Sequence, residues 1–166
     1  MFLKNIFILL ILIVFSSNAL AVTPRSIGKY KNWESFVAET EKGKICFAQT
    51  VPTKRAPAAV KRDKSKLFVT FRPSEEIKDE VSLTSGHDYK TSSVTASSGK
   101  RRYSFFSQKE FAWLLDDQEE KKFIQLMKRA TDIIVKARTT NGAETTDHYS
   151  MMGFTKAYNT AKKTCS

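Results

Sequence analysis

Four consecutive residues carry an acid, an imidazole and two hydroxyl groups: Asp147, His148, Tyr149 and Ser150. A catalytic triad uses such groups, because an acid orients the imidazole and the imidazole takes the proton of a nucleophilic hydroxyl. In a β-strand, however, successive side chains point to opposite faces, so Asp147 would point away from His148 and Ser150. We therefore expect no catalysis here. Asp147 and Ser150 are expected to cap the turn into the last helix, and His148 to face solvent.

Residue types that bind metals and cofactors are sparse. The chain has two histidines, two cysteines and six glycines, too few for a zinc cluster or a glycine-rich phosphate loop. His87 and His148 are too far apart in the sequence for the spacing that is typical of a metal-ligand set. Carboxylates gather in residues 116–120, where they are explained by a helix start, because acids stabilise the first turn. We expect no metal, no cofactor and no enzymatic activity.

The basic residues are the stronger functional indication. Lysine and arginine number 28 against 17 acidic residues, which gives a net charge of +11. Nine of these cations form two groups: Lys54, Arg55, Lys61, Arg62, Lys64 and Lys66 in one segment, and Lys100, Arg101 and Arg102 in another. Anionic lipid headgroups, lipopolysaccharide phosphates and acidic polysaccharides are partners for such a positive field. Arginines interleaved with aromatic residues are missing, so nucleic acid is not expected. The alternative is a loop whose charges are only solvated.

The first 21 residues have the pattern of a secretory signal peptide. Lys4 precedes an unbroken run of ten apolar residues at positions 6–15, which as a helix is about 15 Å long, half of a bilayer core. Small residues at Ala19 and Ala21 fit cleavage after Ala21. We expect a single mature domain over residues 22–166, without a transmembrane segment, in the periplasm, at the cell surface or secreted. The alternative is an uncleaved membrane anchor.

Export determines how the cysteines are interpreted. Cys46 and Cys165 are the only pair and lie 119 positions apart, from 165 minus 46. An oxidising compartment favours a structural disulfide between them. A role for either as a nucleophile would need a free thiolate. The sequence therefore predicts a bridge that ties the mature domain nearly end to end.

Length and composition favour one globular domain, with 166 residues of which 41% are hydrophobic and 27% charged. Short strand patterns recur between glycine turns. They are expected at residues 33–39, 44–50, 67–72, 80–84, 92–97, 100–106, 133–138 and 143–151, with a polar segment at 22–31 and a loop at 51–66. Such a series predicts a mainly β fold, an antiparallel β-sandwich of immunoglobulin-like size.

Two helices are expected beside the strands. Asp117 followed by Glu120 has the pattern of a capping box, and apolar residues at helical spacing predict a helix over residues 118–130. Helical spacing returns after Gly153 and continues to the end of the chain. This second helix is expected to carry Cys165 back towards the first hairpin.

Several segments, taken in order, resemble the invasion-associated locus B family of exported bacterial proteins. They are Trp33, residues 46–49 with Pro52, residues 67–74, residues 79–83 with Gly86, Ala112-Trp113, residues 134–136, residues 146–157 and Cys165. The segment TDHYSMMGFTKA at residues 146–157 is the most similar to the family's carboxy-terminal signature. The chain differs at residues 140–143, where the family tends to have a Ser-Arg-Gly-Thr type of turn, so no ligand role of that arginine carries over.

The resemblance implies a periplasmic or surface-associated protein with a β-sandwich-like domain, linked in host-associated bacteria to virulence and cell invasion. It implies no catalytic residues. We therefore expect a non-enzymatic binding or structural module of the envelope, whose partner is an anionic lipid or polysaccharide or an envelope or host protein. The alternative is a host-surface adhesin or invasion factor.

Overall fold

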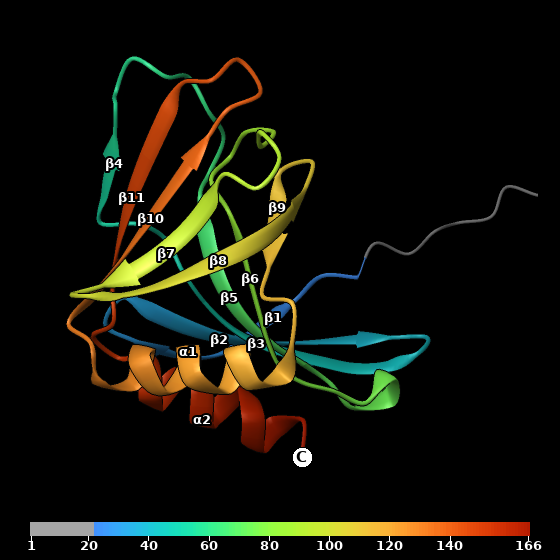
Figure 1. Cartoon of the computed structure of the whole chain (residues 1–166). Coiled ribbons are helices and arrows are strands. Elements are labelled where there is room, and N and C mark those ends of the chain that lie inside the picture. Colours follow the sequence, from blue (N-terminus) through green and yellow to red (C-terminus); the bar gives the residue numbers. More distant parts are fainter. Residues whose placement is uncertain (1–21) are drawn as a thin grey trace, which may run out of the picture.

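The computed structural model describes residues 22–166, and the expected signal peptide, residues 1–21, lies outside the described residues. Strands dominate, and two α-helices, one before the last two strands of the chain and one after them, lie at the base of the molecule (Figure 1). The strands are β1 (Arg25–Tyr30), β2 (Trp33–Thr40), β3 (Gly43–Thr50), β4 (Lys54–Ala56), β5 (Lys66–Arg72), β6 (Ile77–Thr84), β7 (Val94–Ser98), β8 (Arg101–Gln108), β9 (Phe111–Trp113), β10 (Asp132–Arg138) and β11 (Glu144–Ser150). The helices are η1 (Pro73–Glu75), α1 (Asp117–Arg129) and α2 (Phe154–Thr164).

The strands of residues 22–166 form one open antiparallel sheet in the order β1-β2-β3-β5-β6-β9-β8-β7-β10-β11-β4. β8 joins its two halves, because residues up to Phe105 pair with β7 whereas Phe106 and the residues after it pair with β9. The mainly β, antiparallel prediction with an internal and a C-terminal helix is confirmed. A sandwich of two separate sheets is not shown, since the hydrogen bonds continue through β8 from one half to the other.

Most strands lie close to their predicted positions, but β1, β4 and β9 do not follow from the sequence pattern. β1 and β4 fall in the segments expected to be polar or a loop, and they are the two edge strands of the sheet. Most of their residues are exposed, so the alternation of buried and exposed residues that predicts a strand is weak there. Backbone pairing with β2 and β11 holds them in place.

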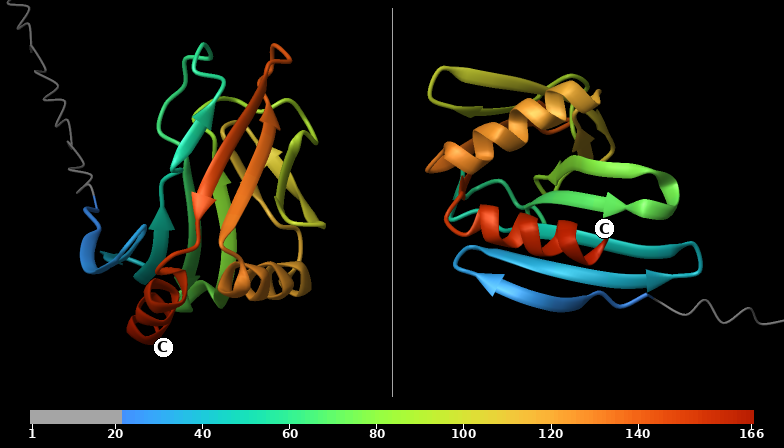
Figure 2. Two further views of the ribbon diagram at one scale, coloured as in Figure 1. Left: turned by 90° about the vertical axis from the view of Figure 1, so that its left-hand side faces the viewer. Right: turned by 90° about the horizontal axis from the view of Figure 1, so that it is seen from below.

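The two helices lie beneath the sheet, α2 along β2 and β3 and α1 beside β6 (Figures 1 and 2). The side chain of Asp116 accepts hydrogen bonds from the backbone N–H groups of Gln118 and Glu119. Asp116 is therefore the N-cap of α1, one residue before the predicted cap. Gly153 precedes α2 with φ +96°, and a Cβ there would collide with the main-chain oxygen of Tyr30. Only glycine lets the end of β1 approach the start of α2 this closely.

The core lies between the inner face of the sheet and the two helices. Trp33 is fully buried, its ring packs 4.7 Å from that of Phe154 in α2, and its indole N–H donates to the main-chain oxygen of Ser150. The predicted disulfide between Cys46 of β3 and Cys165, at the end of α2, is confirmed. It fastens the last residues of the chain to the same part of the sheet that α2 covers.

Candidate anion-binding face

The basic segment, residues 51–66, begins as the edge strand of the sheet. β4 pairs with β11, which sets Lys54 opposite His148 and Arg55 opposite Asp147. Residues opposite each other share a face of the sheet, so Lys54 projects with His148 to the exposed side and Arg55 projects with Asp147 to the inner side. Neighbouring cations of the sequence are thereby separated.

Arg62 lies at the centre of a buried ion pair. Its guanidinium donates to both carboxylate oxygens of Asp147, at 2.6 and 2.8 Å, and the two side chains are 3% and 1% exposed. It also donates to the main-chain oxygen of Ser85, at 3.1 Å. Arg62 was expected to bind an anionic ligand, but its charge is neutralised inside the protein. Asp147 was expected to cap a turn, and it holds the basic segment against the sheet instead.

The loop around Arg62 is fixed by further contacts. The N–H of Asp63 donates to the main-chain oxygen of Gly86 at 2.8 Å, and a Cβ at Gly86, where φ is +73°, would collide with the Asp63 backbone. Two buried hydroxyls of the described residues, on Ser85 and Tyr149, have no hydrogen-bond partner. Burial raises the pKa of Tyr149 well above its usual value, which keeps this phenol neutral. The basic segment is thus docked on a buried polar cluster.

The exposed side of β4, β11, β10, β7 and β8 forms what we term the charged face, made of Lys54, Lys136, His148 and Arg102 with the serines and threonines between them. One row of opposed residues runs Lys54, His148, Ile134, Ser97 and Arg102. The next row sets Thr146, Lys136, Thr95 and Ser104 side by side. At a strand spacing of about 4.8 Å, Lys54 and Arg102 lie about 19 Å apart. The sheet therefore presents cations and hydroxyls over a broad surface.

A cleft of about 350 Å³ lies on this face. Its basic side chains are Lys90, Arg102, Lys136 and Arg138, and hydroxyls of Ser92, Ser93, Thr95 and Thr146 lie between them. The one carboxylate in its lining, Glu144, accepts from Arg138 at 2.8 Å, and this hydrogen bond holds the pKa of Glu144 below its usual value. The cleft keeps a net positive charge and many hydroxyl donors, which is suited to phosphate or carboxylate groups.

The other predicted cations are dispersed. Lys61 and Lys64 are exposed in the loop after β4, and Lys100 and Arg101 are exposed at the turn between β7 and β8. Lys66 lies on the other half of the sheet, with its Nζ 5.8 Å from the ring centre of Phe68. The structure thus keeps Lys54 and Arg102 together on one face, but it does not gather all nine.

Three members of the cleft, Lys90, Lys136 and Arg138, are not among the predicted residues. They stand singly in the sequence, so no local charge density marks them. The alternation in β10 is the signal that indicates them, because Lys136 and Arg138 take its exposed positions while Val135 and Ala137 are buried. Their neighbours, however, come from β7 and β8 and depend on the strand order.

The tetrad of residues 147–150 is divided as strand alternation predicts. Asp147 and Tyr149 are buried, whereas His148 and Ser150 lie half-exposed on the opposite side. The Ser150 hydroxyl accepts from the N–H of Met152, so it stabilises the turn before α2. His87 is engaged elsewhere, within hydrogen-bonding distance of the Thr145 hydroxyl at 2.9 Å. Residues 22–166 contain no group of three or more histidine, cysteine or acidic side chains placed to hold a metal ion.

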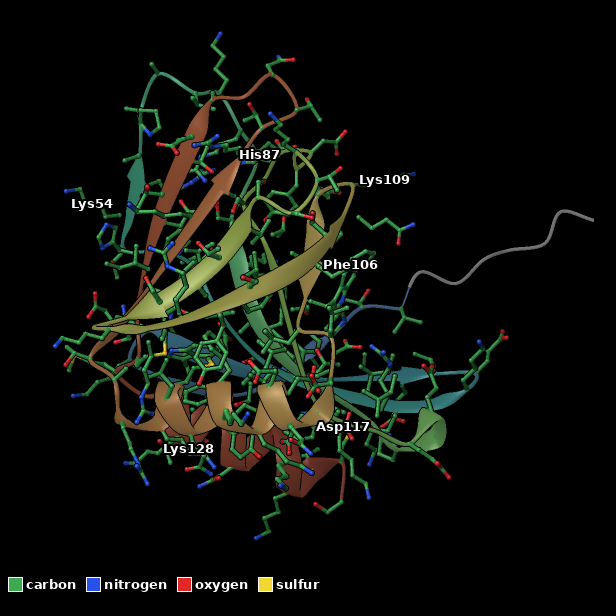
Figure 3. The ribbon with its side chains drawn as sticks, viewed as in Figure 1. Lys54, His87, Phe106, Lys109, Asp117 and Lys128 are labelled. Carbon is green, nitrogen blue, oxygen red and sulfur yellow. A yellow bond between two sulfur atoms is a disulfide. The ribbon has the colours of Figure 1, made fainter. Side chains whose placement is uncertain are left out.

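An acidic cleft lies at the opposite end of the molecule, between β6 and α1, where Figure 3 labels Asp117 at the start of the helix. Glu120 is buried at its side, and its carboxylate accepts from the N–H of Val81 at 2.9 Å. Burial, with the neighbouring charges of Glu80, Asp117 and Asp79, raises the pKa of Glu120 to about 7. Lys54 and Asp117 lie on opposite sides of the view (Figure 3), whereas Arg102, at the other end of the charged face, lines a pocket together with Lys121, which also lines the acidic cleft.

Comparison with protein-family models, curated proteins and solved structures found no match to the chain. Within residues 22–166, neither α-helix has the length and hydropathy needed to cross a bilayer. The function is therefore inferred from the geometry of the described residues, and the resemblance to the invasion-associated locus B family stays a hypothesis.

Proposed function

We propose that the protein is an exported, non-enzymatic module of the bacterial envelope that binds anionic headgroups or acidic polysaccharide through its charged face. The observation that carries this proposal is the register of the sheet, which sets Lys54 and Arg102 in one row with Lys136 beside it. None of these three side chains forms an ion pair with a carboxylate of residues 22–166. Their charge is therefore free to attract an anion.

Export is supported by the disulfide and by the leader pattern of residues 1–21. A Cys46–Cys165 bridge is consistent with an oxidising, extracytoplasmic compartment. The family resemblance points to the same location. The non-enzymatic character is supported by the separation of Asp147 from His148 and Ser150 on opposite faces of β11.

The test is binding to phosphatidylcholine vesicles with and without phosphatidylglycerol, and separately to alginate, an acidic polysaccharide. The two arms distinguish a lipid headgroup from a polymer. Binding should weaken between about 0.01 and 0.15 M salt, where the Debye length falls from about 30 to about 8 Å. The triple variant Lys54→Gln, Arg102→Gln, Lys136→Gln should lose roughly 100-fold in affinity, at about 1 kcal/mol for each charge.

The control is the variant Arg129→Gln, Lys156→Gln, Lys163→Gln. These residues are exposed on α1 and α2, and their replacement changes the net charge by the same amount. The control should bind almost as well as the unmodified protein. Equal losses in the two variants would mean that only total charge matters, and binding to neither probe would refute the proposal.

A further inference from the structure

The other half of the sheet exposes aromatic rings where a sheet surface is normally polar. The aromatic face, as we term it, consists of Phe36, Phe47, Phe68, Phe106, Phe111 and Trp113. Phe106 is 53% exposed and Phe111 38% exposed. Figure 3 places Phe106 beside β8 and β9, on the side away from Lys54. No helix or strand of residues 22–166 packs over these rings, and the cation beside them is Lys66, whose Nζ lies 5.8 Å from the ring centre of Phe68.

The register aligns the rings across neighbouring strands. One row of opposed residues runs Gln49, Phe68, Ser82, Trp113 and Phe106, over β3, β5, β6, β9 and β8. A second row begins with Phe36 and Phe47, whose rings stack with centres 5.2 Å apart and planes 14° apart. With strands about 4.8 Å apart, the first row spans about 19 Å. The aromatic face therefore presents flat ring surfaces along a length of several rings.

A groove of about 340 Å³ lies between the rings, near the lower end of the volumes of small-ligand sites. Phe47 and Phe68 form one wall, and Phe111 and Trp113 form the other. The polar side chains between the walls are Thr70, Ser82, Arg72 and Glu80. Arg72 donates to both carboxylate oxygens of Glu80, at 2.9 and 3.2 Å, and to Glu75 at 3.1 Å, so the cation of the groove is already paired.

The combination of aromatic walls with polar and charged side chains between them favours some classes of ligand over others. A lipid tail would cover the Arg72–Glu80 pair and the hydroxyl of Thr70 without satisfying them, which is costly. An anion would find Arg72 already paired with two carboxylates, those of Glu80 and Glu75, and would be repelled by them. An uncharged sugar presents hydroxyls that both donate and accept, and its ring C–H groups carry partial positive charge that the negative face of an aromatic ring attracts.

We propose that the aromatic face binds a chain of uncharged pyranose sugars, with rings stacked on Phe68 and Trp113 and sugar hydroxyls bonded to Arg72 and Glu80. This site shares β8 with the charged face, but none of its residues belongs to that face. Binding of the sugar should be insensitive to salt, because the sugar carries no net charge whose attraction salt could screen.

The test is titration of the purified protein with cellohexaose and with hexa-N-acetylchitohexaose, two uncharged oligosaccharides, read by tryptophan fluorescence. The chain has two tryptophans, and Trp33 is fully buried whereas Trp113 is half-buried in the groove wall. Either hexaose should protect Trp113 from iodide quenching, and glucose should do so far more weakly because one ring cannot reach both walls. Phe68→Ala should weaken binding at least about tenfold, whereas Phe68→Tyr keeps a ring and should bind like the unmodified protein.

Leu115→Ala is the control, because Leu115 is 78% exposed and lies in the acidic cleft. Circular dichroism of each variant verifies the fold. The proposal is overturned if neither hexaose binds, or if Phe68→Ala binds the sugar as well as Phe68→Tyr does. It is also overturned if another occupant covers the face. That occupant would be a second copy of the chain if the unmodified protein is a dimer that Phe68→Ala dissociates, or a lipid surface if neutral phosphatidylcholine vesicles bind this face. Loss of sugar binding in Phe68→Ala with unchanged binding to alginate would separate this site from the charged face.

Discussion

Replacing Arg62 by methionine should destabilise the protein by about 3–5 kcal/mol, the cost of leaving a buried charge without its partner. Asp147 is 1% exposed, and both of its carboxylate oxygens accept from Arg62. Arg55 is the next cation, with its Nε 3.9 Å from the same carboxylate. This longer contact offsets only a small part of the free energy lost when Arg62 is removed. Methionine fills similar space, so the change isolates the charge and its hydrogen bonds.

The double variant Arg62→Met, Asp147→Leu decides whether charge pairing is the cause. Removing both charges should lower the free energy of unfolding by only about 1–3 kcal/mol, and this loss remains because the main-chain oxygen of Ser85 no longer has its donor. If each single variant costs about 3–5 kcal/mol, the double variant is far more stable than their sum, which is the signature of direct coupling. Equilibrium unfolding in urea at pH 7, with the disulfide intact, measures all three.

Arg138→Met is the matched control. Arg138 also pairs with a carboxylate, that of Glu144, but the two side chains are 53% and 73% exposed. Exposed pairs contribute about 0–1 kcal/mol, so this variant should unfold close to the unmodified protein. A loss below about 1 kcal/mol for Arg62→Met, or a double variant as unstable as the sum of the singles, would refute the buried-pair reasoning.

Three further predictions concern the disulfide, the acidic cleft and the location. Replacing Cys46 and Cys165 together by serine should lower stability by about 4–5 kcal/mol, from the entropy of the long loop they close, without changing the far-ultraviolet dichroism; an unchanged melting temperature contradicts this. Glu120 has a pKa of about 7 in the folded protein against 4.5 otherwise. Folding therefore favours its neutral form, and this contribution is complete below pH 4.5 and lost as the pH rises through 7. Stability should fall over that range, and Glu120→Gln should flatten the profile when unfolding is measured at several pH values; a parallel profile contradicts the assignment. Protease added to intact cells should spare a periplasmic protein until the outer membrane is opened, whereas immediate cleavage favours the surface adhesin.

The local elements could be predicted from the sequence because their signals are local. The hairpin of β2 and β3 follows from two runs with aromatic and β-branched residues around Gly43. The helix α1 follows from apolar spacing and an acidic first turn, with an error of one residue at its cap. The disulfide follows from the only two cysteines. The single continuous sheet could not be predicted in this way, because the place of β8 between β7 and β9 is a long-range property.

Arg62 shows that a run of basic residues in a sequence does not reveal which of them is buried in the structure. Nothing local distinguishes Arg62 from Lys61 or Lys64, since the loop has no periodicity that would mark an inward position. The decisive residue is Asp147, which the structure places at a buried position of β11 although it was expected to cap a turn. A carboxylate that faces the core needs a partner that neutralises it, so the burial of Asp147, which only the structure shows, explains why Arg62 is buried with it.

Both proposed faces depend on register more than on composition. Arg102 and Phe106 project from the same side of β8, four residues or about 13 Å apart, so the charged face and the aromatic face meet on one strand. Arg102 gains Lys54 as a member of its row only through the pairings of β7, β10, β11 and β4. Phe106 gains Trp113 and Phe68 only through those of β9, β6 and β5. A slip of one residue in either series would turn those side chains to the other side of the sheet. The alternate residues of each strand face the core, and burying them disfavours such a slip. The buried residues of each strand therefore determine which side chains are exposed together on the outer surface.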